Sequence, residues 1–421
     1  MLTKADNDML TRVGPGTPMG ELMRRFWVPA LLRTELPEPD CAPIRLRLLG
    51  ENLIAFRMTS GAVGVVGEAC PHRGASLFFG RNEEDGLRCV YHGWKFDLTG
   101  ACVDMPNEPA ESNFKHKIRA TAYPARESGG VVWAYMGPND RMPELPRMEW
   151  CAVPEGYRHV AKWHQEMNYM QGMEGEIDTA HVSFLHKWLK PELSPRPKEN
   201  RRGLAMADGA PELTVKDDEY GFAYGGRRAG EKGEYYWRVT QWLLPFYSLI
   251  ASDSFPRGGR AYIPIDDENT CVFAYYYCVD GPVPEDDLKY FRAGARATAR
   301  VIPGTFRPLA NASNDYLIDR ELQKAGSYSG IWADREQDMA MTESMGRIYD
   351  RTNERLGTTD LAIIAARRRL IQLAKQLQEG TEPYAAGHGD IYFIRSLDCV
   401  DVEGNLGPLL EKHRSQVMPV G

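Results

Sequence analysis

The chain has 421 residues, enough for roughly two to three domains at ~150 residues each, so a single small binding module is excluded. Apolar residues make up 43% of the chain and charged residues 26%, as in globular proteins, and the net charge is −7. This charge excludes the strongly basic surface of nucleic-acid-binding proteins, and no apolar stretch is long enough for a membrane span. The mixed-charge N-terminus carries no apolar signal region, so we expect a cytoplasmic protein. From the charge and the short apolar stretches, we expect contact with neither nucleic acid nor membrane.

Residues 1–39 are expected to form an N-terminal helical segment. Thr17 is a suitable N-cap residue and Pro18 suits the first helical position, with apolar side chains following at helical spacing. Pro29 and Pro37 then end the helical pattern.

Residues 40–155 are expected to form a small all-β domain. From Ile44 onward apolar and polar residues alternate, and glycine-containing turns separate the segments. The pattern continues through 87–96 and ends with a strand over 131–135.

Two loops of this β domain each offer one thiolate and one imidazole. Cys70 and His72 form the first pair, and Cys89 and His92 form the second after an interval of 16 residues. The eight cysteines of the chain have no regular spacing overall, which argues against a disulfide framework and favours a metal site for a close cluster. Zinc is one interpretation, but zinc pairs usually consist of two like ligands, and each pair here is mixed. A Rieske-type [2Fe-2S] cluster needs two thiolates on one iron and two imidazoles on the other, so the pattern favours this cluster.

These loops, with Gly74 in the first and Gly93-Trp94 in the second, resemble those of the Rieske [2Fe-2S] family. The respiratory and photosynthetic branch of that family has a further, disulfide-forming cysteine in each loop, where this chain has Ala75 and Tyr91. At the position of Trp94, that branch has a serine, and the serine hydroxyl donates a hydrogen bond to a cluster sulfur. Because fewer hydrogen bonds to the sulfurs lower the reduction potential, the resemblance implies an electron donor for oxygen chemistry.

Residues 156–421 are expected to form a larger domain in which helices cover an antiparallel sheet, so the chain as a whole is α+β. The expected elements are, in chain order, a helical stretch over 163–188, strands between 204 and 279, and helices over 336–356 and 359–379. The last helix carries an apolar stripe and ends at Gly380.

Two of the nine histidines lie close together in the first of these helical stretches, beside three carboxylates. On a straight α-helix His181 and His186 would point roughly 140° apart, so one metal could bind both only if the helix widens or breaks between them. Two imidazoles and one carboxylate form the facial triad of non-haem Fe(II) oxygenases, and the carboxylate must come from elsewhere in the chain. The alternative is two unrelated histidines on a partly buried helix.

The series Asp178-x2-His181-x4-His186 after a Rieske domain resembles the α subunit of the ring-hydroxylating oxygenases. The segment from Glu336 to Gly346 is similar to the one that supplies the third iron ligand in that family, and Asp338 is the matching position. The phthalate dioxygenase group is the most similar, by motifs that lie in order along the chain: Gly14-Pro-Gly-Thr-Pro-Met-Gly20, Asn314-Asp-Tyr-Leu-Ile-Asp-Arg320, Glu343-Ser-Met-Gly346 and Leu356-Gly-Thr-Thr-Asp360.

This resemblance implies a multicomponent oxygenase. A separate reductase would pass electrons from NADH to the Rieske cluster and on to mononuclear Fe(II), where O2 is activated and a small aromatic substrate is hydroxylated, giving a cis-dihydrodiol. The family forms head-to-tail homotrimers, some of them stacked, in which the cluster of one subunit lies beside the iron of the next. Asp178 would then bridge a cluster histidine, either His72 or His92, to His181; the alternative is a solvated helix carboxylate.

Substrate-binding residues are harder to identify. Asn168 and Gln171 are expected either to line the iron pocket or to be hydrogen-bonded core residues. A phthalate-like acid would favour arginine in the pocket, because its planar guanidinium pairs with carboxylate bidentately, and Arg227, Arg228 and Arg238 lie in the strand region. The alternative for each arginine is an exposed position on a hairpin.

Three other functions compete with this interpretation. A monooxygenase or O-demethylase acting on an aromatic acid or ether would use the same two centres, because the pocket and not the ligand set positions the substrate carbon. A Rieske electron carrier without oxygenase activity would leave residues 156–421, with His181, His186 and Asp338, unused. A zinc-stabilised interaction protein would be colourless, whereas a Rieske protein is red-brown.

Overall fold

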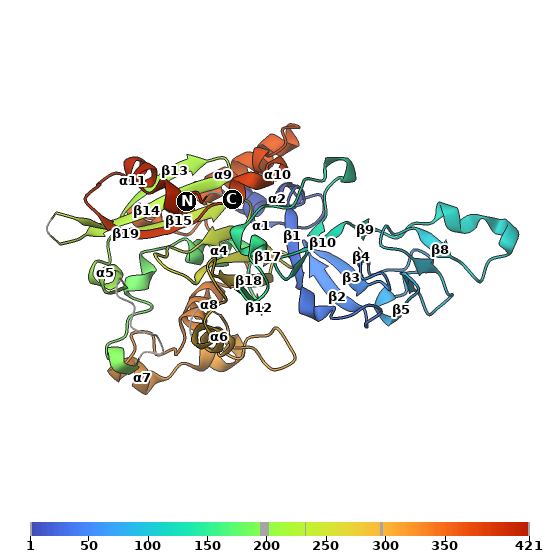
Figure 1. Ribbon diagram of the computed structural model, residues 1–421, viewed down its shortest axis with the longest axis horizontal. Coiled ribbons are helices and arrows are strands. Elements are labelled where there is room, and N and C mark those ends of the chain that lie inside the picture. The colour runs from blue at the N-terminus through green and yellow to red at the C-terminus, as the bar shows by residue number, and fades with distance from the viewer. Residues whose placement is uncertain (1, 194–201, 232, 295–297, 420–421) are drawn as a thin grey trace. The chain divides into compact units, whose positions relative to one another are not determined.

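The computed structural model describes residues 2–193, 202–231, 233–294 and 298–419, and the chain forms two compact units (Figure 1). The smaller unit is Val13–Pro143, and the larger unit joins Met1–Arg12 to Glu144–Gly421. The division therefore comes earlier in the chain than the boundary expected at residue 155. Within the described ranges, no helix combines the length and the hydropathy that crossing a bilayer requires.

The smaller unit contains three antiparallel sheets of described strands. Its strands are β1 Trp27–Leu32, β2 Ile44–Leu48, β3 Glu51–Arg57, β4 Val63–Gly67, β5 Arg81–Glu83, β6 Gly86–Arg88, β7 Lys95–Phe96, β8 Cys102–Asp104, β9 Ala122–Tyr123, β10 Ala125–Ser128 and β11 Val131–Tyr135. The sheets have the orders β1-β11-β10, β2-β3-β4-β9 and β5-β6-β7-β8. The prediction of a small all-β domain is confirmed.

The N-terminal region is less helical than its sequence predicts. Helices α1 (Lys4–Thr11) and α2 (Pro18–Met23) are present, and Thr17 caps the second by accepting a hydrogen bond from the Gly20 N–H at 3.2 Å. The prediction of helix beyond α2 is wrong, because the buried strand β1 pairs with β11. Pro29 lies at a register shift in this pair, where its missing N–H removes no regular ladder bond.

The larger unit is built on an eight-stranded antiparallel sheet. Its strands are β12 Arg158–Gln165, β13 Glu212–Asp218, β14 Gly221–Ala229, β15 Tyr235–Leu243, β16 Tyr247–Leu249, β17 Arg257–Pro264, β18 Thr270–Tyr277 and β19 Leu397–Asp401. The order is β12-β18-β17-β16-β15-β14-β13, with β19 also pairing with β15. The helices of this unit, besides α1, are α3 Glu149–Ala152, α4 Tyr169–Glu176, α5 Arg202–Ala207, α6 Glu285–Arg292, α7 Arg320–Ala325, α8 Asp334–Ser344, α9 Leu361–Gln378, α10 Tyr384–Gly387, α11 Leu406–Lys412 and α12 Arg414–Val417.

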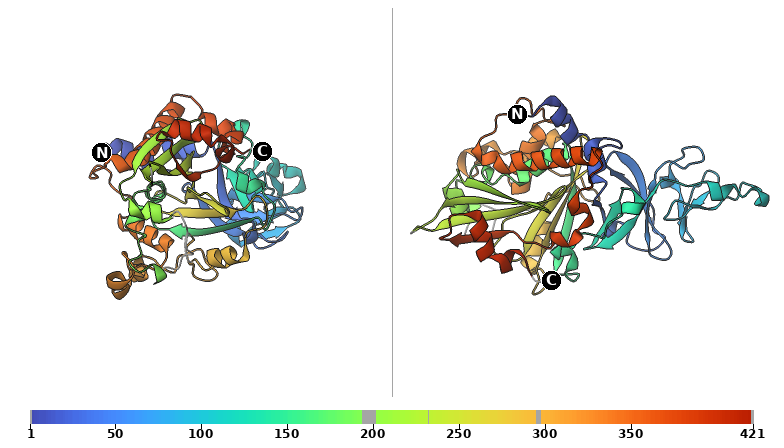
Figure 2. Two further views of the ribbon diagram at one scale, coloured as in Figure 1. Left: turned by 60° about the vertical axis from the view of Figure 1, so that its left-hand side comes forward. Right: turned by 90° about the horizontal axis from the view of Figure 1, so that it is seen from above.

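Helices cover both faces of this sheet. The pairing register puts Arg228, Arg238 and Arg260 on one face, because residues directly opposite in antiparallel strands point to the same side. Helix α4 packs on that face. On the other face, a Cβ on Gly225 would lie 2.8 Å from the Trp237 ring and 2.9 Å from the Leu406 Cδ1 of α11, so the glycine leaves room for both side chains. Figure 2 shows the long helix α9 lying over the same sheet, where it packs against β13.

Two expected helices differ in extent from those observed. The stretch 163–188 begins as the end of strand β12, and its helix α4 stops at Glu176, before both histidines. The helix expected over 336–356 ends at Ser344, where Gly346 adopts a left-handed φ of 90°. The helix expected over 359–379 is confirmed as α9.

A buried ion-pair network fixes α4 within the larger unit. Arg351, which is fully buried, donates to both carboxylate oxygens of Glu174 at 2.9 and 3.0 Å. Arg367 of α9 donates to Glu174 at 2.6 Å and also pairs with Glu354. Because two arginines match the carboxylate of Glu174 inside the core, the C-terminal end of α4 has a defined position relative to α9.

Candidate metal centres

The two cysteine-histidine loops of the smaller unit have the same backbone hydrogen-bond pattern. In the first loop the Cys70 N–H donates to the Ala75 carbonyl at 2.8 Å, and the Gly74 N–H donates to the Cys70 carbonyl at 2.9 Å. In the second loop Cys89 and Gly93 make the equivalent bonds at 2.8 and 2.9 Å. Both glycines have left-handed φ angles, 76° and 79°, so each tight turn depends on a residue without a side chain.

These loops bring together the four residues that the sequence singles out. The Nδ1 atoms of His72 and His92 lie 3.0 Å apart, and desolvation together with the neighbouring His72 lowers the pKa of His92, so the ring stays neutral. Burial raises the pKa of the Cys70 thiol to about 11, and the adjacent Cys89 thiol adds to this rise. Two sulfurs and two imidazole nitrogens on matched loops fit a Rieske cluster, and this donor set does not suit a metal that prefers oxygen.

Trp94 helps to orient the first histidine. Its indole stacks on the His72 ring with centroids 4.4 Å apart, and its Nε1 donates to the Asn107 Oδ1 at 2.6 Å. Beneath the loops lies a buried apolar core, whereas Val90 and Tyr91 are more than half exposed beside them. The second loop therefore lies at a surface that carries large apolar side chains.

The second centre depends on the break after α4. The helix ends at Glu176, and the Asp178 Oδ1 then accepts hydrogen bonds from the N–H groups of Ala180 at 2.7 Å and His181 at 3.3 Å. This side-chain turn starts a short 3-10 turn over His181–Ser183. Because the chain leaves α-helical geometry, His181 and His186 can face one point, as the sequence analysis required.

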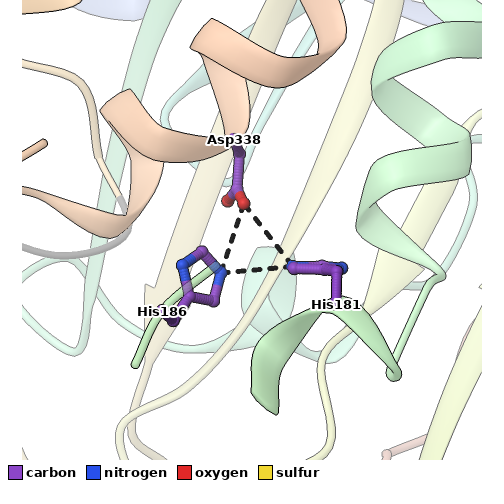
Figure 3. Close-up of side chains that lie close together, drawn as sticks. All are labelled: His181, His186 and Asp338. Atoms are coloured by element: carbon purple, nitrogen blue, oxygen red, sulfur yellow. Dashed lines mark hydrogen bonds and ion pairs between the residues drawn. The ribbon is translucent and has the colours of Figure 1, made fainter. Parts of the chain in front are cut away.

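Asp338 of α8 completes the group, and Figure 3 shows its carboxylate directed at both rings. The two Nε2 atoms of His181 and His186 lie 3.2 Å apart, and the Asp338 Oδ1 lies 3.5 and 3.2 Å from them, respectively. The three ligand atoms thus all lie within 4.8 Å of one another. This arrangement has the ligand types of a facial triad for Fe(II), which leaves coordination positions open for substrates.

A hydrogen bond defines which nitrogen of His186 faces the centre. The His186 Nδ1 lies 2.7 Å from the Gln337 Oε1, and the Gln337 Nε2 donates to the Ile331 carbonyl at 2.8 Å. Because an amide oxygen can only accept, the His186 Nδ1 carries the proton and its Nε2 is left as a lone-pair donor. On the other ring, the His181 Nδ1 lies 3.6 Å from the Asp178 Oδ2.

The surroundings of the triad attract a cation. Burial by itself would raise the pKa of Asp338, but His186 and Arg335 outweigh it and hold this pKa well below the ordinary range. Burial likewise opposes protonation of His181, yet Asp178 and Asp338 raise its pKa to about 10. Two carboxylates that favour a proton on this ring also favour a divalent metal in its place.

Sequence reasoning missed the residues that support Asp338. The Arg335 Nη1 lies 3.5 Å from the Asp338 Oδ2, and the Arg335 Nη2 donates to the Glu176 carboxylate at 3.0 Å. Glu176 also accepts from Tyr262 at 2.7 Å and pairs with Arg260. The available signal was the run of carboxylates before Asp178, but nothing in the sequence indicates which carboxylates become buried.

Asn168 and Gln171 make their hydrogen bonds inside the core. The Asn168 amide donates to the carbonyls of Thr11 at 2.9 Å and Asp267 at 2.7 Å, and its oxygen caps α4. The Gln171 amide donates to the carbonyls of Thr342 in the last turn of α8 and of Gly346 just after it, both at 2.9 Å. Of the two interpretations left open by the sequence, these contacts favour hydrogen-bonded core residues.

The three candidate arginines have different surroundings. Arg227 points to the opposite face of the sheet, where it donates to the Gly404 carbonyl at 2.6 Å and pairs with Glu212. Arg228 is buried, and within the described ranges it donates to two backbone carbonyls. Arg238 faces the α4 side, where its Nη1 lies 3.9 Å from the Asp398 Oδ2 and its side chain is 17% exposed.

Two family models cover most of the chain. Residues 26–122 match the Rieske [2Fe-2S] domain, and residues 134–398 match the family described as LigXa C-terminal domain like. Over 412 residues, 93% of each chain, the protein is 43% identical to the 3-chlorobenzoate-3,4-dioxygenase oxygenase subunit of Comamonas testosteroni. It is 39% identical to the phthalate 4,5-dioxygenase oxygenase subunit of Pseudomonas putida, over 92% of this chain and 89% of that one.

The fold also matches a solved structure. Dicamba monooxygenase bound to dicamba superposes with a TM-score of 0.57 over 85% of this chain and 99% of that chain, at 19% sequence identity. At this identity the match concerns the fold, a Rieske domain followed by a larger domain with an antiparallel sheet.

Proposed function

Since the chain belongs to the Rieske non-haem iron oxygenases and is an oxygenase subunit of this family, we propose that it dihydroxylates an aromatic acid whose carboxylate is held by Arg238. In this proposal Cys70, His72, Cys89 and His92 hold the [2Fe-2S] cluster, and His181, His186 and Asp338 hold Fe(II). When bound, the two groups supply single-electron transfer and the activation of O2, respectively. The electrons come from NADH through a separate reductase, as in multicomponent systems of this kind.

The residues around the triad prepare it for that metal. Gln337 keeps the proton of His186 on Nδ1, so that Nε2 stays available as a ligand. Arg335 keeps Asp338 ionised and occupies its outer oxygen, which leaves Oδ1 directed at the two rings. The chain thus presents three ligand atoms on one side of the metal position, and the substrate would approach from the side without ligands.

Asp178 is proposed to carry electrons between subunits of a homotrimer. One of its oxygens shapes the turn before His181, whereas the other lies 3.6 Å from the His181 Nδ1, and the side chain is 24% exposed. A cluster histidine of a partner subunit can therefore donate to this carboxylate from the surface. Exposed aromatic residues support such docking on both units, with Phe79 and Tyr91 beside the cluster loops and Phe184 and Trp332 on the larger unit.

The substrate class rests on the position of Arg238. Its Nε is buried without a hydrogen-bond partner among the described residues. The carboxylate beside it, Asp398, also accepts a hydrogen bond from Tyr236 at 2.9 Å. Arg238 and Arg228 lie on the same face and repel each other electrostatically, so this face carries two close cations. A substrate carboxylate would offset this repulsion and accept a hydrogen bond from the Arg238 Nε.

The observation that carries the proposal is the convergence of the three ligand atoms within 4.8 Å. The turn that leads to His181 is bonded through the Thr179 carbonyl to Arg228, which lies on the same face of the sheet as Arg238. The test is reductase-coupled oxygen uptake with benzoates, phthalates and a neutral aromatic ether, followed by mass spectrometry of products made under labelled O2. We expect turnover of an aromatic acid and both labelled oxygen atoms in the product. Faster turnover of the neutral ether would instead establish one of the two alternatives. One labelled atom in the aromatic product would indicate a monooxygenase, and an unlabelled phenol formed together with formaldehyde would indicate an O-demethylase. Both relatives reported above are named as dioxygenase subunits, which disfavours these alternatives.

A further inference from the structure

Arg228 of β14 is a buried cation that makes no ion pair with any described residue. It is 1% exposed, and its Nε and Nη2 donate to the carbonyls of Asp208 at 2.8 Å and Thr179 at 3.0 Å. Its remaining nitrogen, Nη1, is buried and has no hydrogen-bond partner among the described residues. Desolvation and the nearby charge of Arg238 lower the pKa of Arg228, so its surroundings disfavour the charge that it carries.

Fold stability alone does not explain this residue. Burying an unpaired guanidinium costs free energy, and a long apolar side chain at the same position would avoid that cost. The neighbouring structure nevertheless makes room for it. A Cβ on Gly226 would lie 2.9 Å from the Thr179 Cγ2 and 3.6 Å from the Arg228 Nη1, so the glycine lets Thr179 and Arg228 meet above the strand.

The two carbonyls that Arg228 binds belong to different segments. Thr179 lies in the turn that Asp178 shapes and that leads directly into His181. Asp208 follows α5, a helix that is itself attached to the turn, because the Ser183 Oγ donates to the Ala205 carbonyl at 3.2 Å. Arg228 therefore joins three segments through one planar group: strand β14, the turn with Asp178 and His181, and the segment after α5.

We infer that Arg228 is a positioning residue for electron transfer and oxygen activation: by holding the Thr179 carbonyl it fixes the turn from which Asp178 and His181 point. The inference rests on the proposed iron ligands and on the proposed electron path through Asp178. It concerns the geometry of that turn and neither substrate choice nor the holding of the metal itself, since Arg228 donates to no ligand side chain.

The test compares holoenzyme variants in a single turnover. Arg228→Leu and Arg228→Lys are loaded with both metal groups and reduced, and the reoxidation of the cluster by O2 and substrate is followed by its visible absorption. Arg257→Leu is the matched control, because Arg257 is also a buried sheet arginine whose Nη1 donates to two backbone carbonyls, those of Ser252 and Ser396. The electron paramagnetic resonance spectrum of the nitric oxide complex of the mononuclear iron is recorded for each protein.

We expect cluster reoxidation to slow by about tenfold in Arg228→Leu, as for other residues that orient metal ligands. Arg228→Lys keeps the charge without the planar group and should slow it by about threefold. Both variants should change the nitric oxide spectrum at normal iron content, while the control matches the wild type in both readouts. If Arg228→Leu does not fold, the lysine variant decides the question.

Wild-type rates and spectra in the Arg228 variants would overturn the inference, as would equal slowing in the Arg257 control. These results differ from failure of the proposed function, which would show as missing mononuclear iron or absent oxygenation in the wild-type protein itself.

Discussion

The Arg335 Nη1 lies 3.5 Å from the outer carboxylate oxygen of Asp338, while the inner oxygen of Asp338 faces both histidine rings. Arg335 also donates to Glu176 at the end of α4, whose side chain is only 4% exposed. The proposed carboxylate ligand on α8 is therefore positioned by Arg335, which is itself bonded to the segment that leads to the two histidines.

Replacing Arg335 by methionine should weaken the iron site and the fold together. We expect mononuclear iron affinity to fall by ~10–100-fold, because Asp338 loses its orienting partner. The free energy of unfolding should fall by about 3–5 kcal/mol, since a buried ion-pair partner is removed. Iron titration and denaturant unfolding measure the two effects. Arg257→Met is the control and should lose stability while keeping its iron; unchanged iron affinity in Arg335→Met would contradict this role.

Asp178→Asn should separate electron transfer from metal binding. Asparagine keeps the oxygen that accepts from Ala180 and His181, so both metal contents should be normal, but it lacks the charged second oxygen. We expect steady-state oxygen uptake to fall by at least about tenfold. Asp350→Asn provides the comparison, because Asp350 shapes an exposed turn in the same manner and should be dispensable for uptake. Normal turnover in Asp178→Asn would rule out the bridge.

Arg238→Met should affect substrate binding and leave the metals in place. Loss of the guanidinium removes the proposed partner of the substrate carboxylate, so KM for the aromatic acid should rise by about tenfold or more. Arg227→Met tests the neighbouring candidate, whose side chain lies on the opposite face of the sheet, and its KM should match that of the wild type. A KM change in Arg227→Met alone would reverse this assignment.

Ionisation of the buried Glu343 carboxyl should lower the free energy of unfolding as the pH rises. Burial raises the pKa of this carboxyl above its ordinary value of 4.5, although Tyr316 and Gln165 donate to it. Below the pKa that this carboxyl has in the unfolded chain, it is protonated in both states and costs no stability. As the pH rises from that value through the higher pKa of the folded state, the unfolded chain releases the proton more readily, and the folded protein loses stability. Glu343→Gln should therefore be more stable than the wild type at pH 8 and no more stable near pH 4, as measured by urea unfolding.

Glu166→Gln is the control for this pH dependence. Glu166 is a neighbouring carboxylate with 58% of its side chain exposed, paired with Arg347 at the surface. An exposed pair contributes about 0–1 kcal/mol, so this variant should show little difference from the wild type at either pH. A pH-independent effect of Glu343→Gln would show that ionisation of Glu343 is not the cause.

The four residues proposed to hold the cluster could be grouped from sequence because each pair lies within one short loop, where spacing alone limits the geometry. The histidines of the second centre were a harder case. Helical periodicity over 163–188 put His181 and His186 on different sides, and only the turn shaped by Asp178 after Glu176 brings them together. Local propensity does not reveal such a break, because a side-chain hydrogen bond sets it.

Residues that depend on sheet register or distant pairing could not be placed from sequence. Arg227 and Arg228 are adjacent in sequence yet point to opposite faces, and a one-residue error in register would exchange them. Glu176 and Arg335 form their ion pair across 159 residues, so their burial follows from tertiary packing alone. The strand β1, where the sequence predicts helix, has the same origin, because its pairing partner β11 lies far away in the sequence.

The most direct test of the account is the content of iron and acid-labile sulfide per chain, measured on protein purified without oxygen. Two separate centres predict about three irons and two sulfides, with a Rieske-type electron paramagnetic resonance signal after reduction. About two irons and two sulfides, with no further uptake of Fe(II), would contradict the second centre at His181, His186 and Asp338 and leave an electron carrier.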